Sequence, residues 1–301
     1  MAQPPRFSAQ HPFLFGFLLI VLAVILLIAS MMLFSSCMQD GKKIPFFNGG
    51  EKIGVVNVQG LIASSRTVTA WIDQLQQDDS IKGVIVRINS PGGVVGPSQE
   101  IFQAVRRLAA SKPTIASMGA VAASGGYYIA AGASEIWANP GTLTASIGVK
   151  AQLKDMGELM HKLGIKEQTV TSGSLKNAGT MFRPMTPEEK IYFQELVDDL
   201  HDQFVTDVAS SRHMDQARVK AVADGRAMTG RQALQAGLVD KMGGFEDAVR
   251  SLKKALALTK DPVLIEGPET KRPLLSRILG SLNIIPSNAM TPGSQWVFSY
   301  E

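Results

Sequence analysis

Residues 114–131 read TIASMGAVAASGGYYIAA, and this stretch decides the fold of the chain. Its first part, residues 114–118, is a run of small and apolar residues that predicts a strand, and the part after Ser124, through Ala131, predicts a helix. Two glycines follow Ser124, so the backbone there can approach a reacting group closely. We expect Ser124 near the helix N-terminus, where the partial positive charge favours a forming oxyanion. The alternative is that the small residues serve close packing of the helix on a sheet.

Short apolar runs and helical patterns alternate on both sides of this stretch. Strands are expected over 53–58, 83–89 and 135–138, and helices over 68–76 and 98–110. The second of these strands has few polar interruptions, as parallel strands buried on both faces do. The alternation predicts an α/β fold with a largely parallel sheet.

Later segments carry clear helix signals. Thr186 is followed by a proline and, three residues on, by a glutamate, which predicts a capped helix start. Further helices are expected over 229–237 and 245–258. Apolar spacing over 274–282 predicts a short amphipathic helix, which would pack on the main domain or a neighbouring subunit, or contact the membrane.

The N-terminal run 13–34 contains no charged residue. At about 1.5 Å per residue, a helix of this length spans the hydrocarbon core of a bilayer. The apolar core of a cleaved signal peptide is shorter, about 7–15 residues. We therefore expect an uncleaved transmembrane helix, with a long signal sequence as the alternative. Cys37 follows a weak lipoprotein-like cleavage pattern, so its lipidation stays open.

The composition excludes several classes of function. The net charge of the 301 residues is only +4, and no basic block is interleaved with aromatic residues, so nucleic-acid binding is not expected. Cys37 is the single cysteine, which excludes an internal disulfide framework. We expect neither a cofactor nor a metal ion.

A glycine-rich loop, NSPGGVVG at 89–96, directly follows the strand 83–89. It lacks the Gly-Lys-Ser/Thr end of a phosphate loop and does not match GxGxxG. Its glycines can present unpaired backbone N–H groups to a developing oxyanion. The alternative is a strand-to-helix turn that needs unusual backbone angles.

No histidine is placed to activate Ser124, since none of the four histidines lies in a glycine-rich loop. Lys176 lies among small polar residues in TSGSLKNAG, at 171–179. A lone lysine is usually a solvated surface charge, but the lack of another base makes this one a candidate. Its pKa, ordinarily near 10.4, would have to fall by about 3 units, which costs roughly 4 kcal/mol and which burial can supply.

Five segments, in this order, resemble signal peptide peptidase A, the bacterial protease IV family, in its short form with one catalytic domain. They are SPGG at 90–93, ASGGYY at 123–128, TASIGV at 144–149, SGSLK at 172–176 and TGRQA at 229–233. The resemblance covers about residues 53–265 and implies a serine–lysine peptidase with a ClpP/crotonase-like fold of repeated βαβ units. The chain departs from the family at Ala120-Val121 and at Ser174-Leu175, and neither departure removes a group that the mechanism needs.

The resemblance also implies roles for five residues. Ser124 is expected to be the nucleophile and Lys176 the general base. Ser146 is expected to orient the lysine. The backbone N–H groups of Gly93 and Gly125 are the expected oxyanion donors.

Two other readings of the chain remain. An acyl-CoA enzyme with a crotonase-like fold would need the two oxyanion N–H groups but neither Ser124 nor Lys176, and a transmembrane helix would be unusual on it. A non-catalytic membrane scaffold would have no reason to keep both side chains.

From the resemblance we expect a single-pass protein of the bacterial cell (inner) membrane with its catalytic domain outside the cytoplasm. Its substrates would be cleaved signal peptides and other small or unfolded peptides. It would form a homo-oligomeric ring in which subunits share active sites. The expected parts are a cytoplasmic tail (1–12), the transmembrane helix (13–34), a linker (35–52), the peptidase domain (53–265) and a C-terminal tail (266–301).

Overall fold

A computed structural model describes residues 51–268, the backbone of Phe298–Tyr300, and Phe13, Gly16, 20–27 and Ser30 near the N-terminus. The chain divides into two compact units, Met1–Gly49 and Gly50–Glu301. In the first unit the described residues are helical. None of the described helices combines the length and apolar character that crossing a bilayer requires. Half of the predicted transmembrane helix, the whole tail 1–12 and the predicted helix over 274–282 lie outside the described residues.

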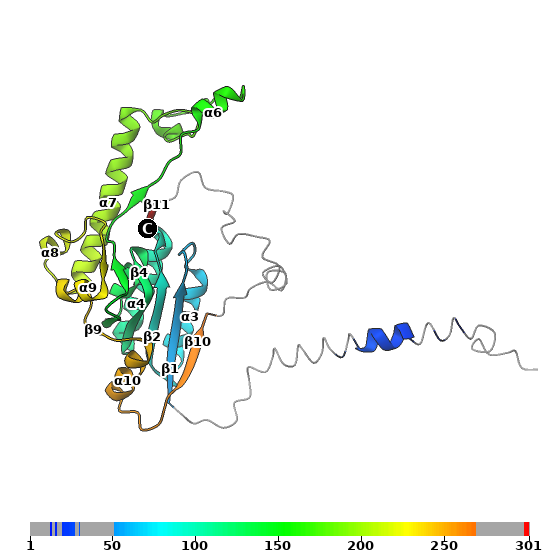
Figure 1. Ribbon diagram of the computed structural model, residues 1–301, viewed down its shortest axis with the longest axis vertical. Helices are drawn as coiled ribbons and strands as arrows, with labels where there is room; N and C mark the ends of the chain where they lie inside the picture. Colours follow the sequence, from blue (N-terminus) through cyan, green and yellow to red (C-terminus); the bar gives the residue numbers. More distant parts are fainter. Residues whose placement is uncertain are drawn as a thin grey trace, which may run out of the picture. The chain divides into compact units, whose positions relative to one another are not determined.

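The second unit is built on an eight-stranded sheet with a mainly parallel order (Figure 1). Its principal strands are, in spatial order, β10 (Val263–Gly267), β1 (Lys52–Gln59), β2 (Ile81–Ser90), β4 (Thr114–Ala123), β5 (Glu135–Ala138) and β9 (Lys241–Met242). All of these neighbours run parallel. The predicted α/β fold is therefore confirmed, and it fits the ClpP-like domain that the resemblance implies.

Two short strands extend the sheet beside the end of β4. β6 (Leu143–Ala145) pairs in parallel with Val121–Ala123, and β8 (Ala227–Thr229) pairs antiparallel with β6. This pairing explains why β4 continues to Ala123, beyond the strand predicted over 114–118. Three further short strands, β3 (Gly93–Val94), β11 (Phe298–Tyr300) and β7 (Lys150–Ala151), form a separate small sheet.

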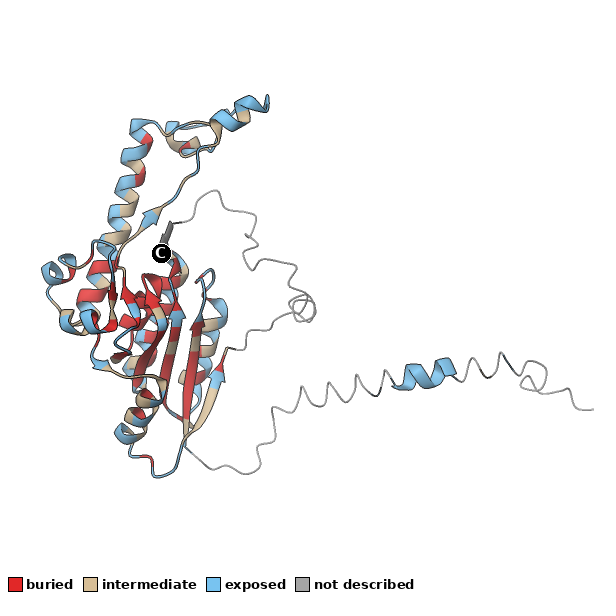
Figure 2. Ribbon diagram, viewed as in Figure 1, coloured by how far each residue is buried: buried red, intermediate tan, exposed pale blue. Residues whose placement is uncertain are grey.

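Helices cover both faces of the central sheet, whose strands are largely buried (Figure 2). Side chains that alternate along each strand belong to two separate cores. On one face Val84, Val86 and Ile88 of β2 join a core shared with α3, α4, α5 and α7. On the other face Ile85 joins a smaller core shared with α10. The helices of this unit are α3 (Arg66–Gln77), α4 (Val95–Ser111), α5 (Gly125–Ala131), α6 (Gly157–Lys162), the 3-10 helix η1 (Ser174–Asn177), α7 (Pro187–Ser211), α8 (Gln216–Lys220), α9 (Gly230–Ala236) and α10 (Phe245–Ala255).

The predicted helix starts are confirmed. At the start of α7 the backbone N–H of Glu189 donates to Thr186 Oγ1 at 3.2 Å, and the N–H of Thr186 donates back to Glu189 Oε2 at 2.9 Å. At α9, Thr229 is the capping residue and Gly237 ends the helix with a left-handed φ of 81°. Such a C-terminal position favours glycine because it has no Cβ to clash.

Residues 152–186, which we call the arm, connect β7 to α7 and contain α6 and η1 (Figures 1 and 2). Ala178 is the single buried residue of the arm. The backbone N–H of Met156 donates to the carbonyl of Met181 at 2.7 Å. This bond joins the segment of the arm that leads away from β7 to the segment that returns to α7. The arm thus has almost no core of its own.

Candidate active site

Ser124 lies at the junction that its sequence predicts, between β4 and α5. Its backbone angles are φ 55° and ψ −119°, outside the regions that ordinary residues populate. Two hydrogen bonds hold this geometry, from Ser124 N–H to the Ala145 carbonyl at 2.7 Å and from Tyr128 N–H to the Ser124 carbonyl at 2.9 Å. Strain of this kind persists only where neighbours impose it, and it concentrates at functional sites.

The Ser124 hydroxyl is buried and unpaired. The residue is 0% exposed, and its Oγ has no hydrogen-bond partner among the described residues. A buried hydroxyl without a partner costs about 1–3 kcal/mol, so native structures avoid one unless it serves a purpose. The geometry and the orphaned hydroxyl together make Ser124 a candidate nucleophile.

The glycine-rich loop lies against Ile62, a residue that the sequence analysis did not identify. Ile62 N–H donates to the Gly92 carbonyl at 2.9 Å, and Val94 N–H donates to the Ile62 carbonyl at 2.8 Å. A methyl group on Gly93 would lie 2.2 Å from the Ile62 carbonyl oxygen, so no other residue fits there without movement. The sequence holds no signal for this contact, because it depends on the approach of two segments far apart in the chain.

The two expected oxyanion donors lie side by side. A methyl group on Gly125 would be 3.4 Å from the backbone nitrogen of Gly93 and 2.5 Å from Ser98 Oγ. Gly125 follows Ser124 directly, so both glycines lie beside the candidate nucleophile. Ser98 Oγ donates to the Val94 carbonyl at 2.9 Å and packs against this pair of glycines. Its proximity to the site is a second feature that the sequence analysis missed.

Ser146 is brought close to Ser124 by the turn after β6. Ala145, whose carbonyl accepts from Ser124 N–H, and Ser146 both have left-handed φ angles, of 60° and 50°. Ser146 Oγ donates to the Gly225 carbonyl at 3.1 Å, and its N–H donates to the Arg226 carbonyl at 3.0 Å.

An ion pair flanks Gly225. The pKa of Asp224 falls to about 2, because the Arg226 guanidinium donates hydrogen bonds to its carboxylate.

Within the described part of the chain, no cluster of histidine, cysteine and carboxylate side chains is arranged to hold a metal ion.

Lys176 is not brought to Ser124 within one chain. It lies in η1 of the arm with its side chain exposed, whereas Ser124 is fully buried. No hydrogen bond joins Lys176 Nζ to Ser124 Oγ or Ser146 Oγ among the described contacts of either serine. The structure therefore gathers Ser124, Gly93, Gly125 and Ser146, and leaves Lys176 apart from them.

An extended segment of this chain lies next to the glycine-rich loop. The backbone of β11 runs antiparallel between β3 and β7, with Tyr300 opposite Gly93 and Phe298 opposite Ala151 (Figure 1). A peptide backbone in the extended conformation thus fits between β3 and β7, directly beside one of the two glycines.

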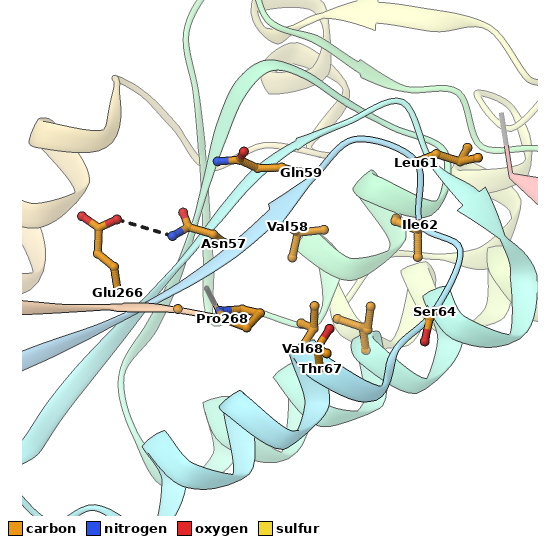
Figure 3. A pocket seen from close by; sticks show the side chains of 12 residues that line it. Asn57, Val58, Gln59, Leu61, Ile62, Ser64, Thr67, Val68, Glu266 and Pro268 are labelled. Carbon is orange, nitrogen blue, oxygen red and sulfur yellow. Dashed lines mark hydrogen bonds between the residues drawn. The ribbon is translucent and has the colours of Figure 1, made fainter. Parts of the chain in front are cut away.

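A separate cavity of about 600 Å³, lined in part by Ile62, lies between β1, β10 and α3 (Figure 3). Val58, Ile62 and Val68 form an apolar part of its wall, and Asn57 donates to Glu266 at its edge at 3.4 Å.

Much of this chain is similar in sequence to known peptidases. The sequence model of peptidase family S49 matches residues 106–259, about half of the chain. A protein of Synechocystis sp. with a provisional protease name is 39% identical over 76% of this chain and 83% of its own length. An Enterococcus faecium protein provisionally named signal peptide peptidase SppA is 39% identical over 72% of this chain and 67% of its own. Protease 4 of Haemophilus influenzae is 33% identical, and the match covers 73% of this chain but 37% of that protein.

The α/β fold and these relatives define the class of the protein, a serine peptidase that hydrolyses peptide bonds. More narrowly, the chain belongs to peptidase family S49 and is of the signal peptide peptidase A type.

Proposed function

We propose that this chain is a membrane-anchored endopeptidase that degrades remnant signal peptides and other small or unfolded peptides. Ser124 is its nucleophile and Lys176 its general base. The observation that carries the proposal is the buried, unpaired hydroxyl of Ser124 on a strained strand-to-helix junction.

In the proposed reaction Ser124 Oγ attacks the scissile carbonyl carbon while neutral Lys176 Nζ takes the hydroxyl proton. The N–H groups of Gly93 and Gly125 stabilise the oxyanion of the tetrahedral intermediate. The protonated lysine then gives its proton to the leaving amine, and an acyl-enzyme on Ser124 remains. Lys176 next deprotonates a water molecule, which attacks the ester carbon. The lysine then returns this proton to Ser124 Oγ as the second product leaves.

The arrangement of the arm favours a lysine supplied by a second copy of the chain. Lys176 is exposed on the arm, and apolar arm side chains are exposed with it, Leu163 to 62% and Val170 to 100%. Exposed apolar side chains on a projecting segment are suited to burial in an interface. Burial of Lys176 against a second copy would disfavour its charged form, and a base must be neutral to accept a proton. We propose a closed homo-oligomeric ring in which the Lys176 of one subunit serves the Ser124 of the next.

A serine-directed fluorophosphonate probe tests the proposed nucleophile. We expect the full-length protein to be labelled once per chain at Ser124, because the activated hydroxyl attacks the phosphorus atom and releases fluoride. Mass spectrometry of the labelled peptide identifies the position. Ser134, which is exposed, provides the matched control, and Ser134→Ala should be labelled as the wild type is. An acyl-CoA enzyme that uses only oxyanion N–H groups would stay unlabelled, and that result would contradict the proposal.

The membrane anchor is proposed from the uncharged run 13–34. A single span would hold the catalytic domain outside the cytoplasm of a bacterial cell, where cleaved signal peptides remain in the membrane. The full-length chain should stay in the membrane fraction after an alkaline carbonate wash, and a chain without residues 1–49 should be released. Release of the full-length chain by the same wash would exclude the anchor.

A further inference from the structure

The position of the arm depends on polar contacts, because it has so little core. Apart from Ala178, residues 152–186 are exposed or only partly buried. An element that buries so little apolar surface gains little orientation from packing. Since Lys176 lies on the arm, whatever fixes the arm also fixes the lysine.

The strongest of these contacts joins the end of the arm to the first turn of α7. Arg183 donates from both terminal nitrogens to Glu189, at 2.9 Å to Oε2 and 2.7 Å to Oε1. The Glu189 side chain is only 3% exposed, and its Oε2 also accepts from Thr186 N–H at 2.9 Å. The hydrogen bonds from Arg183 lower the pKa of Glu189, so its carboxylate is ionised at neutral pH. A two-pronged pair on a buried carboxylate is stronger and more directional than an exposed ion pair.

The segment between Lys176 and Arg183 is short and held at several points. Ala178 is 1% exposed, and Thr180 Oγ1 donates to Glu167 Oε2 at 3.0 Å. The Met181 carbonyl accepts a hydrogen bond from Met156 N–H, on the segment of the arm that leads away from β7. A displacement of Arg183 would therefore also displace Lys176, because these contacts hold the segment between them.

We propose that Arg183 is a positioning residue for the general base. It acts through Glu189, which sets the direction in which the arm leaves α7 and hence where Lys176 meets the neighbouring subunit's nucleophile. This inference rests on the proposed role of Lys176. A guanidinium paired through both terminal nitrogens with a buried carboxylate is held in one orientation, whereas an apolar contact permits several, so this pair suits a positioning role.

The test compares kcat and KM of Arg183→Met with those of the wild-type full-length protein on a peptide substrate. We expect kcat to fall about a hundredfold, the effect of misplacing a catalytic group by about 1 Å. KM should change little, because the described hydrogen bonds of Arg183 go to Pro184 and Glu189 and not to β3, β7 or Ser124. Arg183→Lys should recover part of kcat, since it keeps the charge but not the fork. Glu189→Gln should resemble Arg183→Met, because its amide oxygen still caps Thr186 N–H but no longer carries the charge.

Arg250→Met is the matched control. Arg250 pairs with Asp247 on α10, both side chains are largely exposed, and kcat should not change. Wild-type kcat in both Arg183→Met and Glu189→Gln would overturn the inference, and so would a rise in KM alone or a loss of the assembled mass of the oligomer. Lys176→Ala in the same assay distinguishes failure of the positioning role from failure of the proposed mechanism. If Lys176→Ala is inactive and Arg183→Met is fully active, the positioning role alone fails; if Lys176→Ala is active, the proposed mechanism fails.

Discussion

Ser124→Ala is expected to abolish peptide hydrolysis while the fold stays intact. The rate should fall on the order of 10⁴-fold or more, as it does when a serine peptidase loses its nucleophile. Stability should not fall, because Ser124 Oγ makes no hydrogen bond that alanine would lose. Removing a buried unpaired hydroxyl removes a cost, so the thermal midpoint should equal or exceed that of the wild type. Initial rates on a peptide substrate and a thermal melt check both parts.

Substitution of Lys176, the proposed general base, should also abolish hydrolysis. Lys176→Ala removes the base, and Lys176→Arg should also be inactive, since a guanidinium does not lose its proton near neutral pH. Lys254, exposed on α10, supplies a lysine control whose alanine variant should retain full activity. Near-normal turnover in Ser124→Ala or Lys176→Ala would show that the pair has been wrongly assigned.

Two inactive variants are expected to restore activity when they assemble together. If Lys176 of one subunit serves Ser124 of the next, a mixed ring of Ser124→Ala and Lys176→Ala chains contains interfaces with both groups intact. Random equal mixing makes about a quarter of the interfaces complete, because each needs one particular chain on each side of a heterologous contact. Co-expression with two affinity tags, tandem purification and a rate per active site provide the measurement.

The control replaces the Lys176→Ala chain with the double variant Ser124→Ala/Lys176→Ala, which supplies no nucleophile and should restore nothing. Native mass spectrometry confirms that mixed oligomers have formed. Mixed oligomers without activity would mean that Lys176 acts within its own chain, or not at all. Activity in a strict monomer of the wild type would exclude the ring.

Local signals in the sequence were sufficient for much of the fold and for part of the site. The small residues and glycines around Ser124 predicted the strand-to-helix junction, because few other residues allow such a turn. The pattern that starts at Thr186 predicted a capped helix, because capping depends on neighbours three residues apart. The five family-like segments identified the class of enzyme.

Contacts between distant segments could not be predicted in this way. The support of Gly93 by Ile62 depends on how the chain returns after β1, and no local pattern encodes it. The left-handed backbone of Ala145 and Ser146 is imposed by neighbours on β4 and β8. The separation of Lys176 from Ser124 in one chain also escapes the sequence, since sequence spacing does not reveal whether a loop folds back or projects.

The small sheet of β3, β11 and β7 has a consequence for the choice of substrates. A peptide that takes the place of Phe298–Tyr300 would be held by main-chain hydrogen bonds to strands on either side. Every peptide offers the same main-chain groups, but only a segment released from its own fold can offer them on both edges. Binding of this kind would select substrates by their conformation more than by their side chains, and would leave folded proteins uncut.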